Sequence, residues 1–363
     1  MLEVALKLLE EITSRGFKAY IVGGFVRDYI LGISSNDIDI TTSATPKDIK
    51  EIFDDSCLPS EDYGSVTVIM KGIRFEITTF RKEIGYIDNR RPAEIKYIDD
   101  LYEDLLRRDF TINTICMDEK GNIVDLLNGQ EDLKNGVIKT VGIAKDRFEE
   151  DVLRILRAVR FATILDFRLD NEVIEAIKDR RELLSGLSYN RKKEELDKIF
   201  GSSYANKGIE LLLGLGLDKY LELDNLGKVK CTSSLIGVWT VLDVLDKYPF
   251  SANEREFISA VKEALNYNNL DAYTLYRFGL YANSVAGEIN GYDIKDITES
   301  YNNLVIQSKK DLNISSQDIM NCLNKGPGSY LKEIYGDVER QVLYKRLDNN
   351  KDRIIEYIIS KYI

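Results

Sequence analysis

The chain has 363 residues, which is enough for two or more domains with hydrophobic cores of their own. It contains no histidine, and this excludes Ser-His-Asp and Cys-His triads as well as histidine-ligated zinc and iron sites. The formal net charge of −11 argues weakly against nucleic acid binding, although a net charge does not describe the local field at one surface.

Carboxylates, lysine, arginine, hydroxyl groups and hard metal ions remain for catalysis. A carboxylate-rich site without histidine suits Mg²⁺, or Mn²⁺, with phosphate substrates. No apolar run approaches the ~20 residues that cross a bilayer, residues 1–12 have the pattern of an amphipathic helix, and the four cysteines are far apart. We therefore expect a cytoplasmic protein without a membrane partner.

The first part of the chain predicts a small head of mixed α/β structure. The expected elements are a helix at 2–12 ended by Gly16, a strand at 18–22, a turn at Gly23-Gly24, a helix at 25–32 closed by Gly32, a strand at 37–41, and a hairpin of residues 66–70 and 73–80. Residues 81–98 are polar and basic, and we expect a loop there.

Beyond residue 140 apolar side chains recur at i, i+3 and i+4, and strand patterns are scarce. The expected fold class is α+β, with a small head containing a mixed β-sheet and helices, followed by an elongated all-helical neck, body and tail. The expected boundaries are 1–137 for the head, 138–200 for the neck, 201–265 for the body and 266–363 for the tail.

Asp37 and Asp39 are two residues apart in the strand pattern DIDIT, so their side chains share one face while Ile38 and Ile40 face a core. Two carboxylates this close repel each other unless a cation lies between them. A pair of metal ions there activates an attacking hydroxyl group and stabilises a leaving phosphate oxygen. By itself, however, such a pair is more often two solvated acids on an exposed strand.

The neighbouring residues favour the metal site. Gly23-Gly24 lie between a strand and a helix start, where backbone N–H groups cradle a phosphate, and Arg27 follows on the first turn to clamp a triphosphate. Glu76, in the hairpin strand RFEITTFR, is either a third carboxylate at the metal or one partner of a cross-strand ion pair.

Three sequence blocks, GGFVRDYILG, NDIDITT and RRDFTINT, resemble the class II tRNA nucleotidyltransferase and bacterial poly(A) polymerase family. The resemblance implies a nucleotidyltransferase head in which Gly24 and Arg27 bind the triphosphate. It also implies that Asp37 and Asp39 are the catalytic residues and hold two Mg²⁺ ions.

The third of these blocks contains Arg107, Arg108 and Asp109. The resemblance implies that it contacts the sugar and phosphates of the nucleotide. This agrees with the chemistry of the side chains, because Arg108 offers a planar donor fork and Asp109 can accept from a ribose hydroxyl. The alternative is that Arg108 is a solvated residue at the start of a helix.

Residues 149–162, EEDVLRILRAVRFA, predict an amphipathic helix. Its apolar arc contains Val152, Ile155, Leu156, Ala158, Val159 and Ala162, and its charged side contains Asp151, Arg154, Arg157 and Arg160. For an isolated segment, ion pairing at i, i+3 explains this pattern best. In the family that the chain resembles, however, E-D-x-x-R-x-x-R is the nucleotide-recognition block.

The pair of Asp151 and Arg154 is able to choose the base. Cytosine and adenine present an amino donor beside a ring-nitrogen acceptor, whereas guanine and uracil present a carbonyl acceptor beside an N–H donor. A fixed Asp acceptor beside a fixed Arg donor therefore accepts C and A and rejects G and U, because a mismatch buries unpaired polar groups. We expect Arg157 and Arg160 to orient this pair or to hold the triphosphate or RNA.

The later segment NRKKEELDKIF fits a further block of the family, R-x-x-x-E-x-x-K, with Arg191, Glu195 and Lys198. Charges at i, i+3 and i+4 brace a helix, so we expect a structural role, with Ser188 as the N-cap.

Residues 80–110 resemble the flexible loop of CCA-adding enzymes, and the C-terminal part resembles their tail. This implies template-independent addition of C, C and A to the tRNA 3′ end from CTP and ATP. The expected partner is the tRNA acceptor arm, gripped by shape and phosphates, and DNA is not an expected partner. The alternatives are a poly(A) polymerase, an A-adding enzyme, and a catalytically silent RNA-binding protein.

Overall fold

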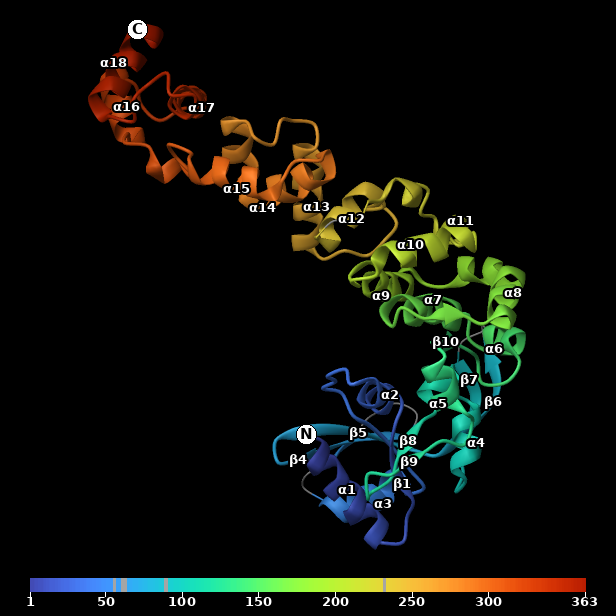
Figure 1. Ribbon diagram of the computed structural model, residues 1–363. Helices are drawn as coiled ribbons and strands as arrows, with labels where there is room; N and C mark the ends of the chain where they lie inside the picture. The colour runs from blue at the N-terminus through green and yellow to red at the C-terminus, as the bar shows by residue number, and fades with distance from the viewer. Residues whose placement is uncertain (55–56, 60–63, 88–90, 231–232) are drawn as a thin grey trace. The chain divides into compact units, whose positions relative to one another are not determined.

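The computed structural model describes the chain except for residues 55–56, 60–63, 88–90 and 231–232 (Figure 1). The chain forms two compact units, residues 1–224 and 225–363. A mixed sheet with helices comes first and helices follow, so the expected α+β class is confirmed. The boundaries expected after residues 137, 200 and 265 stay predictions.

A seven-stranded sheet with the order β3-β4-β5-β2-β1-β8-β9 is the framework of the head. Strands β2 and β5 run parallel, and the other neighbouring pairs run antiparallel. The strands are β1 (Ala19–Val22), β2 (Asp39–Thr42), β3 (Cys57–Pro59), β4 (Ser65–Met70), β5 (Ile73–Thr79), β8 (Cys116–Met117) and β9 (Ile123–Val124). The predicted hairpin is confirmed, because β4 and β5 flank a turn in which Lys71 and Gly72 both have positive φ.

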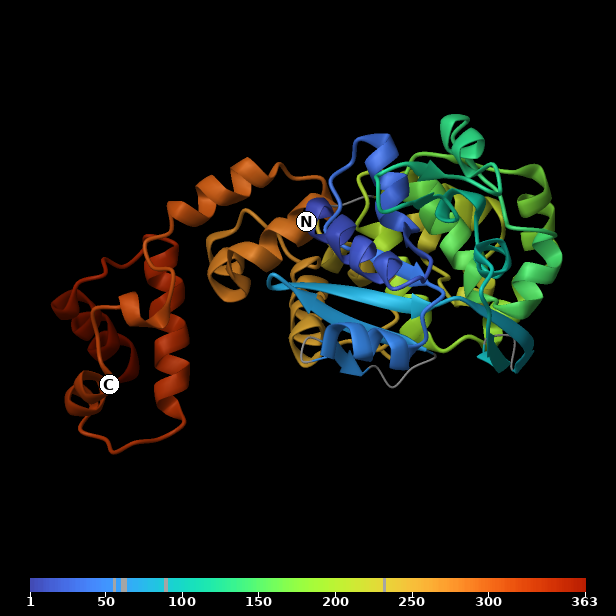
Figure 2. The ribbon, with the colours of Figure 1, turned by 90° about the horizontal axis from the view of Figure 1, so that it is seen from below.

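Four helices accompany the sheet: α1 (Leu2–Ser14), α2 (Gly24–Leu31), α3 (Pro46–Phe53) and α4 (Leu101–Leu106). Helix α1 packs against β1 and α3 against β3 and β4 (Figures 1 and 2). Ala5, Leu8, Leu9 and Ile12 of the first helix are fully buried, whereas Leu2 at its start is half-buried. Gly32 ends α2 in the left-handed conformation at φ 71°. The sequence therefore predicted α1 and α2 correctly, whereas α3 and α4 were not among the predicted elements.

The loop expected at 81–98 is wrong. Strands β6 (Arg81–Ile87) and β7 (Arg91–Tyr97) form an antiparallel ribbon in which Arg81 lies opposite Tyr97. Among the residues of this ribbon whose burial the structure describes, 81–85 and 93–97, none is buried, so no buried face produces an alternating pattern there. Polar contacts with other elements hold the base of the ribbon. Glu83 of β6, for example, accepts hydrogen bonds from Arg81 and from Arg107 beyond α4.

The rest of the first unit is mainly helical. Its elements are α5 (Gly129–Lys134), β10 (Val137–Ile138), α6 (Ala144–Glu150), α7 (Leu153–Ile164), β11 (Arg168–Leu169), α8 (Asn171–Arg180), α9 (Tyr189–Phe200), α10 (Ala205–Gly214) and α11 (Asp218–Leu221). Helix α7 packs against both α9 and α10, and its predicted apolar arc is buried throughout. This burial leaves the arginines of α7 on the side that meets the head.

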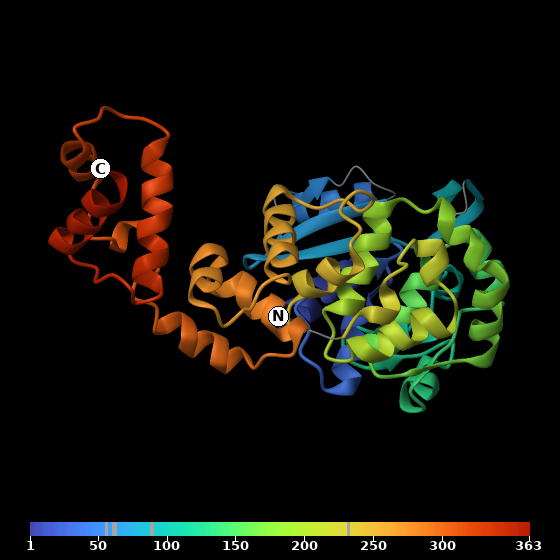
Figure 3. The same cartoon turned by 90° about the horizontal axis from the view of Figure 1, so that it is seen from above.

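The second unit consists of α12 (Leu235–Leu242), α13 (Ala252–Ala264), α14 (Ala272–Asn290), α15 (Ile294–Asn302), α16 (Ser316–Leu323), α17 (Tyr330–Leu343) and α18 (Lys351–Tyr362). Its last helices, red in Figure 3, surround one apolar cluster that includes Ile319, Val338 and Ile354, all fully buried. Among the described residues, no helix has the length and apolar character that a membrane span requires.

Candidate active site

The carboxylate pair lies at the start of β2. Asp39 is the first residue of the strand and Asp37 precedes it by two; both are exposed, whereas Ile38 and Ile40 are buried. The predicted alternation of faces is therefore confirmed. The parallel register places Asp39 opposite Glu76 of β5, which is also exposed, so the third acid singled out in the sequence lies beside the pair.

The electrostatics of Asp39 favour a cation. Its pKa is raised to about 6, mainly because the surrounding protein removes part of its water and also because Asp37 and Glu76 are negatively charged. The positive charge of Arg108 acts in the opposite direction. In the described part of the chain no three acidic or cysteine side chains gather closely enough to form a complete metal cage.

The glycine turn lies beside this pair. Gly23 has φ 81° and ψ −135°, a conformation that L side chains rarely adopt, and it caps the N-terminus of α2. A β-carbon added to Gly23 would lie 3.8 Å from Nη1 of Arg108 and 4.0 Å from Oδ2 of Asp39. The structure therefore brings together the turn, Arg108 of the RRD block and the carboxylates, although Gly23 and Arg108 are more than eighty residues apart in the sequence.

Arg27 lies next to the turn, and its side chain is largely buried. Its Nε donates to Oδ1 of Asp28 at 2.9 Å, and its Nη1 donates to Oδ1 of Asn113 at 2.8 Å. A β-carbon added to Gly24 would lie 3.6 Å from Nη2 of Arg27. The guanidinium is thus held next to the backbone of the proposed phosphate cradle.

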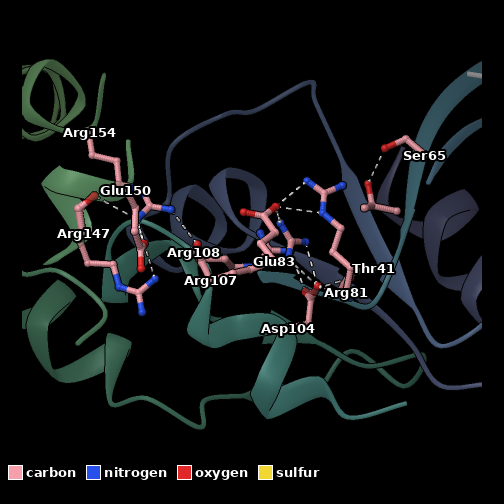
Figure 4. A network of polar contacts seen from close by, with 11 residues as sticks. Thr41, Ser65, Arg81, Glu83, Asp104, Arg107, Arg108, Arg147, Glu150 and Arg154 are labelled. Atoms are coloured by element: carbon pink, nitrogen blue, oxygen red, sulfur yellow. Dashed lines mark hydrogen bonds and ion pairs between the residues drawn. The ribbon is translucent and has the colours of Figure 1, made fainter. Parts of the chain in front are cut away.

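Asp104 of α4 was not singled out in the sequence. It is fully buried, and its Oδ2 accepts from the hydroxyl of Thr41, two residues along β2 from Asp39. Its Oδ1 accepts from Nε of Arg107 at 2.9 Å, and its Oδ2 accepts from Nη2 of Arg108 at 3.5 Å (Figure 4). Burial alone raises the pKa of Asp104, but these two arginines outweigh it and hold the pKa below the ordinary value.

Asp104 therefore holds the arginines of the RRD block against β2, the strand that begins at Asp39. The sequence signal for this role was weak, because one acid four residues before an arginine is common on helices. The alternative that Arg108 is a solvated residue is wrong, since its side chain is 18% exposed.

The single helix expected at 149–162 is wrong. Helix α6 ends at Glu150 and α7 begins at Leu153, while Asp151 between them has an extended backbone at φ −143° and ψ 105°. Oδ1 of Asp151 accepts from the backbone N–H of Leu153 at 3.0 Å, a capping interaction that competes with continuing the helix. Burial raises the pKa of this carboxyl group. Asp151 and Arg154 remain close, as the nucleotide-selection hypothesis requires.

Arg154 is held from several sides (Figure 4). Its Nη1 donates to Glu150 at 2.8 Å and to the carbonyl oxygen of Arg147 at 3.2 Å, and its Nη2 donates to the carbonyl oxygen of Arg107 at 3.0 Å. The last contact joins α7 to the end of α4 in the head. Arg154 is thus connected to the RRD block through the backbone carbonyl of Arg107.

The other two arginines of α7 have carboxylate partners. Nε of Arg157 donates to Oδ2 of Asp109 at 2.7 Å, and Nε of Arg160 lies 2.8 Å from Oε2 of Glu195. Burial raises the pKa of Asp109, but Arg157 and the hydrogen bonds from Asn113 and the Phe110 N–H lower it to about 2. These contacts support an orienting role for both arginines, and they occupy Asp109, whose predicted contact with ribose stays a prediction.

The block in α9 contributes Glu195, which is buried and also lies 3.6 Å from Lys198. Its contact with Arg160 supports the structural role expected for this block. Ser188 occupies the predicted N-cap position of α9, although its side chain makes no capping hydrogen bond.

Comparison with known protein families gives three matches. Residues 19–139 match the family described as Poly A polymerase head domain, residues 166–225 a probable RNA- and SrmB-binding site of polymerase A, and residues 236–358 a putative tRNA nucleotidyltransferase domain 2. The chain is 35% identical over 383 residues to the CCA-adding enzyme of Ligilactobacillus salivarius, covering 97% of this chain and 95% of the relative. It is 37% identical over 385 residues to that of Listeria monocytogenes, with coverage of 98% and 97%.

Solved structures show the same likeness. The Bacillus stearothermophilus CCA-adding enzyme in complex with CTP has a TM-score of 0.87 and 29% identity, covering 99% of this chain and 96% of that one. The Thermotoga maritima CCA-adding enzyme complexed with tRNA shares the fold, with a TM-score of 0.72 and 21% identity.

Proposed function

This chain belongs to the CCA-adding enzymes, which are tRNA nucleotidyltransferases, and we infer that it adds C, C and A in turn to the 3′ end of tRNA. CTP and ATP are its substrates, pyrophosphate is released, and no nucleic acid template is used. The observation that carries this inference is the likeness to curated relatives over 97% and 98% of the chain. Poly(A) polymerase and A-adding activity are less well supported, because both of these relatives are CCA-adding enzymes.

Nucleotidyl transfer in this family depends on a divalent metal, and we propose Mg²⁺ as the resident ion, with Mn²⁺ as a substitute. Asp37 and Asp39 would hold it, and the negative charge of Glu76 beside Asp39 would add to the attraction for the cation. Two bound ions would supply activation of the tRNA 3′-hydroxyl and neutralisation of charge on the leaving pyrophosphate. The carboxylate pair also opposes the alternative of a catalytically silent RNA-binding protein, since RNA binding has no use for clustered acids.

The remaining residues bind and orient the nucleotide. Gly24 and Arg27 hold the triphosphate, and Arg108 lies between that cradle and the carboxylates, where its charge faces the reacting phosphate. Asp151 and Arg154 pair with the base and admit C and A. Selectivity therefore resides in side chains of the protein.

A second group of residues supports this arrangement. Asp109 holds Arg157, and Glu195 holds Arg160, so both arginines keep α7 oriented towards the nucleotide. The helical parts of the chain grip the tRNA acceptor arm, with the tail proposed at 266–363. We place the protein in the cytoplasm, consistent with the free thiols of Cys116 and Cys322.

Metal affinity should fall at acid pH. A carboxyl group must lose its proton to bind a metal, so protonation of Asp39, with its pKa of about 6, competes with the ion. We expect Mn²⁺ to bind about tenfold more weakly at pH 5 than at pH 7. Electron paramagnetic resonance measures the free Mn²⁺ directly. Equal affinity at both pH values would contradict the assignment of Asp39 as a ligand.

Substrate use tests the proposed reaction. We expect the protein to extend tRNA lacking CCA by two residues with CTP alone and by three with CTP and ATP together, as read on a sequencing gel. UTP and GTP should give no comparable product. Incorporation of ATP in long runs onto any RNA would identify a poly(A) polymerase instead.

A further inference from the structure

The amide of Asn113 lies between two charged groups. Its Oδ1 accepts from Nη1 of Arg27 at 2.8 Å, and its Nδ2 donates to Oδ1 of Asp109 at 3.1 Å. The other oxygen of Asp109 accepts from Arg157 of α7 at 2.7 Å. Arg27, Asn113, Asp109 and Arg157 therefore form a continuous chain of hydrogen bonds from α2 in the head to α7, and Asn113 and Asp109 are 6% and 8% exposed.

The neighbours of Asn113 require an amide. One side faces a guanidinium and needs an acceptor, and the other faces a carboxylate and needs a donor. A carboxylate at this position would repel Asp109, and a cation would repel Arg27. An apolar side chain would remove one buried hydrogen bond from Arg27 and one from Asp109.

The ring of Phe161 on α7 holds the same arginine from a second direction. The guanidinium carbons of Arg27, Arg157 and Arg160 lie 5.1, 5.4 and 4.3 Å from its centroid. Such contacts attract a cation to the ring, more strongly where water is excluded, and Phe161 is 5% exposed. Arg27 is therefore oriented by the amide of Asn113 and the ring of Phe161 in addition to its contact with Asp28.

We propose that Asn113 is a positioning residue for the triphosphate. It holds Arg27 beside the glycine turn and connects that arginine, through Asp109 and Arg157, to the nucleotide-recognition helix α7. This inference rests on the proposed role of Arg27 as a triphosphate ligand. Its consequence is that Asn113 affects phosphate binding only through Arg27.

The test measures binding of inorganic pyrophosphate to the full-length protein by calorimetry, together with steady-state kinetics. We expect Asn113→Leu to weaken pyrophosphate binding about tenfold and to raise KM for CTP and ATP in proportion, with KM for tRNA and kcat unchanged. In an Arg27→Ala background, Asn113→Leu should have no further effect on pyrophosphate binding, because the residue through which it acts is gone.

Two further variants guard against a general effect on folding. Asn113→Asp keeps the size of the side chain and the acceptor for Arg27 but loses the donor to Asp109, and we expect intermediate weakening. Asn283→Leu is the matched control, because Asn283 is also fully buried and its amide donates to the carbonyl of Thr274 in the other unit. This control should keep its affinity for pyrophosphate.

The outcomes separate the two ideas. If Arg27→Ala weakens pyrophosphate binding but both Asn113 variants leave it unchanged, the positioning role is overturned and the role of Arg27 stands. Equal losses from Asn113→Leu with and without Arg27 would overturn it as well. If Arg27→Ala has no effect, the proposed triphosphate site itself fails, and the inference about Asn113 fails with it.

Discussion

Replacing Asp39 by asparagine is expected to reduce the rate of nucleotidyl transfer by at least about a thousandfold. The carboxylate lies beside Asp37 and opposite Glu76, so its loss removes a charge from the place where the metal must bind. The stability of the fold should not fall, because burial and the negative charges of Asp37 and Glu76 disfavour the charged form of Asp39. Single-turnover assays with CTP measure the rate, and fluorescence anisotropy with labelled tRNA measures binding, which should persist.

The matched control for this prediction is Asp99→Asn. Asp99 is also an acid of the head, but its side chain is 78% exposed and it pairs with Lys18 at the surface. We expect full activity from this variant, since surface pairs contribute little. Substantial turnover by Asp39→Asn, at the metal concentration that saturates the unaltered protein, would remove Asp39 from the proposed metal site.

Arg154→Ala is expected to relax the choice of nucleotide. Arg154 is the fixed donor beside Asp151. When its guanidinium is removed, binding of a base with the wrong pattern of donors and acceptors no longer leaves a buried polar group unpaired against it. We expect the preference for CTP and ATP over UTP and GTP, measured as the ratio of kcat/KM values on tRNA lacking CCA, to fall at least about a hundredfold. Unchanged ratios would contradict the pairing hypothesis.

The fold should tolerate this change in part. Glu150 loses Arg154 but keeps Arg147, whose Nη1 lies 2.8 Å from the same carboxylate oxygen. Arg180→Ala is the control, because it removes an arginine of α8 that pairs with Glu149, the residue immediately before Glu150. Its selectivity should match that of the unaltered protein, while thermal melting of both variants separates a loss of stability from a loss of discrimination.

The sequence by itself determined the local features of the site. The alternation of Asp37 to Ile40 predicted which side chains share a face, because the pleat of a strand reverses direction at every residue. Helical spacing predicted the buried face of α1 and of α7, and Gly32 predicted the end of α2. In each case the physical cause acts over a few neighbouring residues, so the pattern is present in the sequence itself.

Only the tertiary structure decided how these features are joined. Asp104 binds partners at positions 41, 81, 107 and 108, and Asn113 binds Arg27, which lies 86 positions earlier in the sequence. The ribbon of β6 and β7 likewise depends on contacts with residues beyond α4. Hydrogen bonds and ion pairs between residues distant in the sequence leave no periodic pattern. The carboxylates of the site were therefore predictable from the sequence, whereas the buried polar residues that hold its arginines in place were not.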